Sequence, residues 1–205
     1  VSAASIIAND DAGIPVNGLT GGTAFTNVLT NDTLNGVAVN ASQVNLTFVS
    51  STNAGITLSG TDVVVAPGTP AGPYTLTYQI CEVLNASNCD TAVVTVNVSA
   101  ASIIANDDNG TAVNGLTGGT AFTNVLTNDT LNGVAVNASQ VNLTFVSSTN
   151  AGITLSGTDV VVAPGTPAGS YTLTYQICEV LNASNCDTAV VTVTVSAASI
   201  LANDD

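Results

Sequence analysis

The sequence contains no lysine, arginine or histidine, whereas aspartate and glutamate together number 14, so its formal net charge is −14. A chain without basic side chains cannot neutralise phosphate groups, which excludes nucleic acids and anionic membrane surfaces as partners. The usual general base, Schiff-base amine and oxyanion-binding guanidinium of enzymes are missing as well. Because side-chain salt bridges are also excluded, the carboxylates can find partners only in backbone N–H groups, water or metal cations.

Other groups on which function often depends are also scarce. The chain has no tryptophan, no methionine and only 4% aromatic residues. It has no apolar run near the 18 or so residues of a membrane span and no basic segment typical of a signal peptide, so we expect any targeting segment to lie outside this sequence. The chain has no histidine, and its four cysteines are divided between two copies of a repeat described below. Two cysteines in each copy are too few ligands for zinc, so we expect no zinc site.

Paired carboxylates are the one remaining catalytic possibility, because two acids can hydrolyse a glycoside. The candidate pairs are Asp10 with Asp11 and Asp62 with Glu82. Adjacent acids at the end of a strand point apart, however, and we therefore predict no catalytic residues and no enzymatic activity.

The chain is a tandem repeat. Ile6 recurs as Ile103 and Ile200, 97 residues apart each time, and the cysteines keep the same spacing. Between residues 1–97 and 98–194 only five positions differ, namely Ala12/Asn109, Ile14/Thr111, Pro15/Ala112, Pro73/Ser170 and Asn97/Thr194. We predict one repeat over residues 1–99, a second over 100–196, and the first strand of a third over 197–205.

The most informative stretch of each repeat is Tyr74–Val98, together with its copy Tyr171–Val195. Apolar and polar residues alternate on both sides of a polar centre, which predicts two half-buried strands joined as an antiparallel hairpin. If Cys81 faces Cys89, Gln79 pairs with Thr91 and both cysteines lie on the polar face.

The four cysteines therefore predict two disulfides, Cys81–Cys89 and Cys178–Cys186. The alternative is a set of free, buried thiols, since an unpaired cysteine is usually an interior residue. The threonines around these cysteines favour the disulfide. A disulfide in turn indicates an oxidising compartment.

The rest of the repeat consists of short strands and turns. We expect strands at 2–8, 23–30 and 44–48, and a second hairpin of 56–58 and 63–65 joined by four residues. About seven short strands without a segment of helical period predict the all-β class, with tandem immunoglobulin-like antiparallel β-sandwiches arranged end to end.

Acidic clusters with the sequence Ala-Asn-Asp-Asp stand at the predicted domain junctions and resemble the linker motifs of cadherin-type repeats. The resemblance implies calcium at the junctions, held by oxygen ligands. The alternative is an Asx-rich turn satisfied by its own backbone. The candidate ligands are Asn9, Asp10, Asp11, Asn106, Asp107, Asp108, Asn203, Asp204 and Asp205. We expect no other cofactor.

Asp-Thr-apolar triplets in each repeat resemble the acceptor motif of bacterial general O-glycosylation. The resemblance implies O-linked glycans at Thr33, Thr91, Thr130 and Thr188. Thr91 is predicted on the polar face beside the disulfide, where a glycan would be sterically free.

The cysteine-bearing hairpin, the preceding V-A-P-G-T-P-A-G and the segments A-N-D-D and V-L-T-N-D-T resemble tandem repeats of very long surface proteins of gliding bacteria that use type IX secretion. Such repeats are similar to immunoglobulin-like domains of adhesins. The resemblance implies an extracellular, cell-surface and non-enzymatic role.

We therefore expect a structural repeat of an extracellular filament or adhesin stalk, acting as a stiff spacer pinned by disulfides. Its partners would be neighbouring copies of the repeat or other filament subunits. One alternative is a module that binds a glycan or receptor multivalently. Another is a filament subunit that completes its neighbour by strand exchange.

Overall fold

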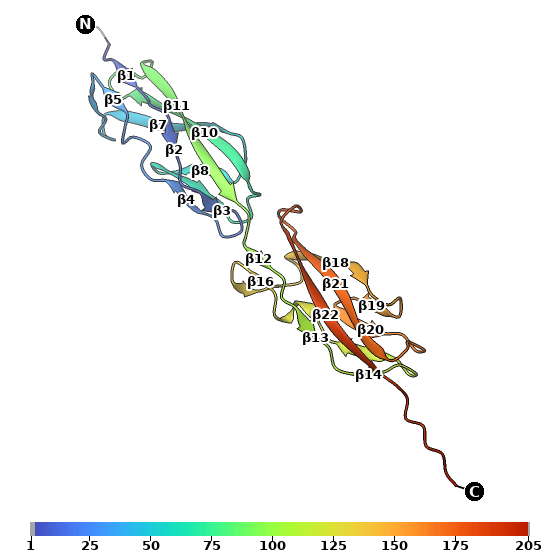
Figure 1. Cartoon of the computed structure of the whole chain (residues 1–205). Helices are drawn as coiled ribbons and strands as arrows, with labels where there is room; N and C mark the ends of the chain where they lie inside the picture. Colours follow the sequence, from blue (N-terminus) through green and yellow to red (C-terminus); the bar gives the residue numbers. More distant parts are fainter. Residues whose placement is uncertain (1–2, 205) are drawn as a thin grey trace. The chain divides into compact units, whose positions relative to one another are not determined.

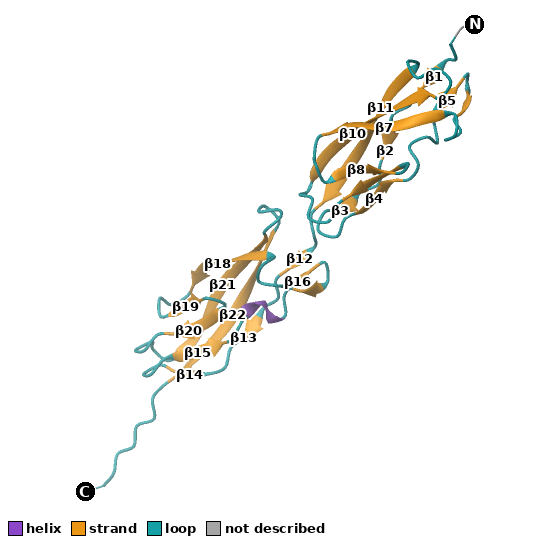
Figure 2. Cartoon of the chain, turned by 180° about the vertical axis from the view of Figure 1, so that it is seen from behind, coloured by secondary structure: helices purple, strands orange, loops and turns teal. Residues whose placement is uncertain are grey.

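The computed structural model describes residues 3–204 of the chain, which divides into two compact units, Val1–Ala100 and Ala101–Asp205. Both units are built from β-strands, and the only helical element among the described residues is a short 3-10 turn, η1, in unit 2 (Figures 1 and 2). The predicted all-β class is confirmed.

Each unit has eleven short strands. Those of unit 1 are β1 (Ile6–Ile7), β2 (Asp11–Ala12), β3 (Val16–Asn17), β4 (Gly22–Phe25), β5 (Thr33–Leu34), β6 (Val37–Ala38), β7 (Val44–Ser51), β8 (Ile56–Ser59), β9 (Asp62–Val65), β10 (Gly72–Glu82) and β11 (Cys89–Ser99). Those of unit 2 are β12 (Ile103–Ile104), β13 (Asp108–Asn109), β14 (Val113–Asn114), β15 (Gly119–Phe122), β16 (Thr130–Leu131), β17 (Val134–Ala135), β18 (Val141–Ser148), β19 (Ile153–Ser156), β20 (Asp159–Val162), β21 (Gly169–Glu179) and β22 (Cys186–Ser196), with η1 (Val125–Thr127) between β15 and β16.

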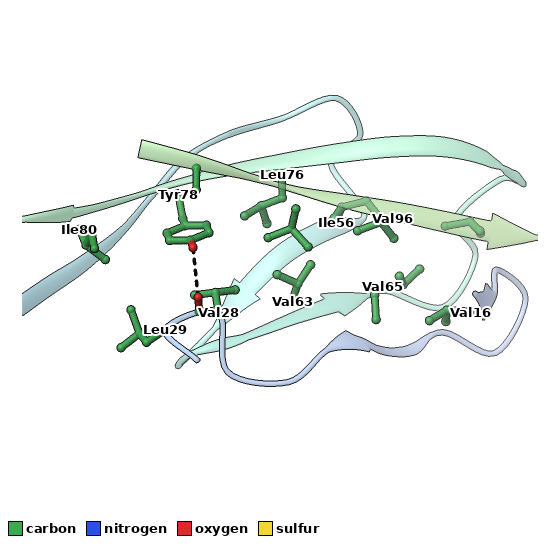
Figure 3. Packing of buried hydrophobic residues seen from close by; sticks show 14 of the residues in the cluster. Val16, Val28, Leu29, Ile56, Val63, Val65, Leu76, Tyr78, Ile80 and Val96 are labelled. Atoms are coloured by element: carbon green, nitrogen blue, oxygen red, sulfur yellow. Dashed lines mark hydrogen bonds between the residues drawn. The ribbon is translucent and has the colours of Figure 1, made fainter. Parts of the chain in front are cut away.

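The sheets of unit 1 form an immunoglobulin-like β-sandwich. One sheet has the order β2–β11–β10–β7, with β3 also paired to β11, and it faces the sheet β4–β9–β8. Leu76, Tyr78 and Val96 from the first sheet pack against Ile56 and Val63 from the second (Figure 3). A third, smaller sheet, β1–β5–β6, completes the unit. Unit 2 repeats all three sheets with the corresponding strands.

The long hairpin has the predicted register. Gln79 pairs with Thr91, Thr75 with Thr95 and Cys81 with Cys89 across β10 and β11. The apolar residues of the alternating pattern face the core, because successive side chains of a strand point to opposite faces of the sheet. Binary patterning therefore predicted both the existence and the register of the longest element.

The N-terminal part of each unit pairs with its last strand in the parallel direction. In unit 1, Asp11 pairs with Val94 in β11, and Val16 pairs with Val98 further along the same strand. Unit 2 shows the same arrangement between β13, β14 and β22. The chain therefore joins the sheet beside the middle of β11, runs parallel to that strand towards its C-terminal end, and later leaves the sheet from that end.

One predicted strand and one predicted turn differ from the structure in this part of the chain. The strand expected over residues 23–30 ends at Phe25, because Asn27 adopts a left-handed conformation with φ 54° that no strand accommodates. Val28 and Leu29 instead lie in a loop, and their side chains are buried in the hydrophobic core. The hairpin of β8 and β9 turns in two residues and not in four, since Ser59 pairs with Asp62 and Gly60 supplies a positive φ.

The strand expected over residues 2–8 is reduced to Ile6–Ile7, which pairs with β5. On both sides of this short strand, side chains accept backbone N–H groups that would otherwise bond to a neighbouring strand. The Asn35 side chain accepts the Ser5 N–H, and the Asp90 side chain accepts the Ala8 N–H. The corresponding residues 197–204 form no strand. Their assignment to a third repeat stays a prediction, and Asp205 lies outside the described residues.

Candidate functional site

Each unit encloses two carboxylates and a tyrosine next to its hydrophobic core. In unit 1, Asp32 precedes β5 and is fully buried, Asp11 lies in β2 with 8% of its surface exposed, and Tyr78 reaches them from β10. Figure 3 shows the Tyr78 hydroxyl pointing away from β10 towards the loop that carries Val28. We call Asp11, Asp32 and Tyr78 the carboxylate cluster.

The Tyr78 hydroxyl lies among four acceptor oxygens. Both carboxylate oxygens of Asp32 are 3.1 Å from it, and the carbonyl oxygens of Val28 and Asn9 are 3.0 Å and 3.2 Å away. A hydroxyl carries one hydrogen, so it can donate to only one of these oxygens at a time. Asp32 also accepts the Asn9 N–H at 2.8 Å, whereas Asp11 Oδ2 is buried without a hydrogen-bond partner. The cluster is therefore rich in acceptors and short of donors.

This imbalance changes the protonation of the cluster. Burial raises the pKa of Asp11 to about 6, and the negative charge of Asp32 adds to the effect. Burial also raises the pKa of Asp32 itself, and it is the largest cause of the raised pKa of Tyr78. Because no basic side chain exists to neutralise the pair, the folded unit holds a proton here more tightly than an exposed carboxylate would.

Unit 2 repeats the cluster with Asp108, Asp129 and Tyr175. Asp129 is fully buried, and the Tyr175 hydroxyl lies 3.2 Å from both of its oxygens and 3.5 Å from Asp108 Oδ2. Burial again raises the pKa of Asp108 to about 6, ahead of the charge of Asp129. Asp32 and Asp129 were not among the site residues predicted from the sequence. Their sequence signal is an acid directly before a two-residue strand, within the Asp-Thr-apolar triplets interpreted above as glycosylation motifs.

Several of the remaining carboxylates bind backbone amides of their own unit. The Val93 N–H donates to Asp10 at 2.8 Å, the Asn27 N–H to Asp62 at 2.8 Å and the Ala8 N–H to Asp90 at 2.9 Å. Unit 2 has the equivalent bonds to Asp107, Asp159 and Asp187. In a chain without cations, carboxylates thus fasten loops to strands by charge-assisted hydrogen bonds.

The predicted calcium ligands lie within this arrangement. Asn9, Asp10 and Asp11 contact unit 1, and Asn106, Asp107 and Asp108 make the corresponding contacts in unit 2. Asn203 and Asp204 are exposed, and Asp205 lies outside the described residues. Across residues 3–204, no three His, Cys, Asp or Glu side chains converge as a metal site would require. Calcium at the junctions stays a prediction.

Both predicted disulfides are present, Cys81–Cys89 and Cys178–Cys186. The loop that each one closes holds a glutamate and two asparagines. In unit 1, the Asn85 and Asn88 amides both donate to Glu82 Oε2, and Asn88 also donates to the Ala4 carbonyl at 2.9 Å. The hydrogen bonds from Asn85, followed by those from Asn88, lower the pKa of Glu82.

The corresponding loop of unit 2 forms two hydrogen bonds with the first residue of that unit. The Asn185 amide donates to the Ala101 carbonyl at 2.8 Å, and the Ala101 N–H donates to Glu179 at 3.3 Å. The tip of each long hairpin thus forms hydrogen bonds with the N-terminal segment of its own unit. The sequence predicted a hairpin here but not this contact.

The candidate glycosylation sites fall into two groups. Thr91 and Thr188 are exposed on the outer face of β11 and β22, where a glycan has room. Thr33 and Thr130 are partly buried in the central strand of the small sheet, and the aspartate before each of them belongs to the carboxylate cluster. Thr91 and Thr188 are therefore the more accessible pair in the folded units; glycosylation itself stays a prediction.

The two acid pairs considered for glycoside hydrolysis are committed to structural contacts. Asp10 is exposed and holds Val93, whereas Asp11 is buried in the carboxylate cluster. Asp62 holds the loop before β5, and Glu82 lies in the hairpin loop. The residues of each pair therefore serve different contacts.

The chain matches no protein-family model and no curated protein. It is similar in structure to extracellular cadherin domains 3–6 of protocadherin gamma B2 (11% identity, TM-score 0.38), covering 95% of this chain and 51% of that one. It is similar to mouse cadherin-23 EC22–24 (12%, TM-score 0.37; 96% and 65% covered) and to the endo-fucoidan hydrolase MfFcnA4 of glycoside hydrolase family 107 (12%, TM-score 0.36; 96% and 29%). The chain spans about half the length of the protocadherin fragment, and none of these likenesses bears on function. Among the described residues, no helix is long and apolar enough to cross a membrane.

Proposed function

We propose that this chain is a load-bearing spacer of an extracellular filament or adhesin stalk. The observation that carries the proposal is the parallel pairing of β2 and β3 with β11 in unit 1, and of β13 and β14 with β22 in unit 2. The location on the surface of a gliding bacterium and the partnership with neighbouring copies of the repeat belong to the same proposal. The disulfides support an oxidising, extracellular location.

Parallel terminal strands resist tension well for a geometric reason. When the two ends of a unit are pulled apart, β2 and β11 are drawn in opposite directions along their own axes. The hydrogen bonds between them are then loaded together in shear, and none can break alone as in the opening of a hairpin. The bonds Gly13 N–H to Thr95 O at 2.8 Å and Gly18 N–H to Ser99 O at 2.9 Å extend this shear-loaded interface beyond the paired residues.

Side chains reinforce the same interface. Asp10 accepts the Val93 N–H just before the paired residues, and the Ser99 hydroxyl donates to the Val16 carbonyl at its far end. The disulfide keeps the hairpin tip closed, which holds Asn88 in place under tension. The hydrogen bond from the Asn88 amide to the Ala4 carbonyl is then kept. Near-identical units suit this role, because a spacer needs length and its units need no individual binding specificity.

Single-molecule stretching of the intact chain tests the proposal. We expect two unfolding events at similar, high forces, since the units differ at only five positions. Replacing Asp10→Ala together with Asp107→Ala removes one reinforcing acceptor per unit and should lower both forces, because forced unfolding depends on the unfolding barrier. Asp204→Ala, in an exposed segment without strand structure, is the matched control. Unfolding at forces that none of these replacements changes would count against the proposal.

A further inference from the structure

The two repeats differ at exposed positions only, and these positions lie together. The five differing residues of unit 1 and their five counterparts in unit 2 are all exposed. Other exposed positions are identical in the two repeats, among them Val37 and Val134, which are 69% and 70% exposed. Drift after duplication would scatter differences over the whole exposed surface. The confinement of the differences to one region therefore points to a function of that region.

The region surrounds the second half of β11. On one side of β11, Asn97 pairs with Pro73 of β10. On the other side, Thr95 of β11 pairs with Ala12 of β2. Ile14 and Pro15 follow in the link from β2 to β3, which rejoins β11 at Val98. Both units have the same backbone bonds here, since Ile14 N–H donates to Ala24 O and Thr111 N–H donates to Ala121 O.

A groove lies in this region of unit 1. Its volume is about 490 Å³, within the range of small-molecule sites, and two of the five differing residues, Pro73 and Asn97, line it. Thr75 lines it with a hydroxyl and Asn97 with an amide, and ring surfaces come from Pro73 and Tyr74. The hydroxyls of Thr52 and Thr95 also line it, although they already bond backbone groups of Thr75 and Asp11. The groove thus combines hydrogen-bonding groups with flat apolar surfaces.

The lining limits the chemistry of a ligand. The groove contains no charged side chain, and the chain around it has 14 acidic and no basic residues, so an anionic ligand would be repelled. A peptide cannot be added to β11 as a further strand, because β10 pairs with it on one side and β2 and β3 on the other. The pairing of β10 with β7 begins only at Leu76, and next to the groove Pro73 has no N–H to offer an added strand. A neutral sugar fits both conditions, since it offers hydroxyl groups at its rim and C–H groups on its ring faces.

We propose that this groove of unit 1 binds a neutral oligosaccharide and that unit 2 lacks the site. Among the lining residues, unit 2 has Ser170 in place of the Pro73 ring and Thr194 in place of the Asn97 amide. Next to the groove, Thr111 replaces the apolar Ile14. Binding rests on one tyrosine ring per site, so a single site is weak. This function is independent of the spacer role, and either can fail alone.

The intact chain tests the proposal by NMR titration with neutral hexasaccharides of glucose, mannose, xylose and galactose, with an alginate hexasaccharide as the anionic control. We expect shifts of Thr75, Thr95 and Asn97 with at least one neutral probe and none with alginate. The corresponding residues of unit 2, Thr172, Thr192 and Thr194, should not shift.

Exchange of the five residues supplies the matched variants. Ala12→Asn, Ile14→Thr, Pro15→Ala, Pro73→Ser and Asn97→Thr together should weaken binding at least tenfold. The fold should be kept, because unit 2 already carries these residues. The reverse exchange in unit 2 (Asn109→Ala, Thr111→Ile, Ala112→Pro, Ser170→Pro and Thr194→Asn) should create a second site. The proposal is overturned by no binding to any neutral probe, by equal binding to both units, or by binding that the exchange leaves unchanged.

Discussion

The Tyr78 hydroxyl lies 3.1 Å from both carboxylate oxygens of Asp32, inside a unit that has no basic side chain. Asp11 extends this buried group with an oxygen that has no partner. A fold that usually depends on its apolar core thus contains an acidic interior element whose charge only protons or metal ions can offset.

The first prediction concerns pH. Asp11 has a pKa of about 6 in the folded unit against an ordinary value of 3.8, so the folded chain binds more protons than the unfolded chain between these two values. Stability should therefore fall as the pH rises from about 4 to about 6. Glu82 acts in the opposite direction, because its lowered pKa makes its contribution disappear below its ordinary value of 4.5.

Urea unfolding at pH 5 and pH 8 checks this prediction, with greater stability expected at pH 5. Asp11→Asn with Asp108→Asn should flatten the difference. A chain that is more stable at pH 8, or a pH dependence that the two replacements leave intact, would show that the buried carboxylates do not behave as described.

The second prediction concerns the tyrosine. Tyr78→Phe together with Tyr175→Phe leaves Asp32 and Asp129 buried without the hydroxyl donor, which should cost about 1–3 kcal/mol per unit. Tyr74→Phe with Tyr171→Phe is the control, since those hydroxyls donate to the exposed carbonyls of Pro70 and Pro167. Equal losses in both pairs of variants would contradict a special role of the cluster.

The third prediction concerns the disulfides. Each closes a loop with a sequence separation of 8, for which the chain-entropy relation gives about 2.5 kcal/mol. Replacing all four cysteines by serine should lower the free energy of unfolding by about this amount per unit while circular dichroism still reports a β-sheet protein. Complete loss of the fold would mean that the hairpin tip creates the structure and does not merely close it.

The fourth prediction concerns modification. Mass spectrometry of peptides from the protein isolated from its native source should find O-linked glycans on Thr91 and Thr188, which are exposed, and none on Thr33 and Thr130, which are partly buried. Glycans on the second pair would mean that modification precedes folding, because the adjoining Asp32 and Asp129 are fully buried.

The sequence predicted those parts of the structure that follow from local patterning. Alternation in Tyr74–Val98 determined the strands, their register and the facing cysteines, since one slip would turn every valine to solvent. The pairing of Tyr78 with Asp32 was not predictable, because the two residues are 46 positions apart and the patterns around them, an alternating strand and an Asp-Thr-apolar triplet, do not indicate a contact between them. The parallel pairing of β2 and β3 was missed for a similar reason: two-residue strands have no period, and side chains such as Asp90 and Asn88 hold much of the segment before them.

Comparison of two pulling directions on the same chain tests the load-bearing role most directly. Attachment at both chain ends loads the parallel strands of each unit in shear, whereas attachment at Thr117, just after β14, and at Asp204 peels β14 and β13 from β22 one bond at a time. The account predicts that unit 2 withstands a clearly higher force in the first geometry than in the second. Equal forces in the two geometries would contradict it.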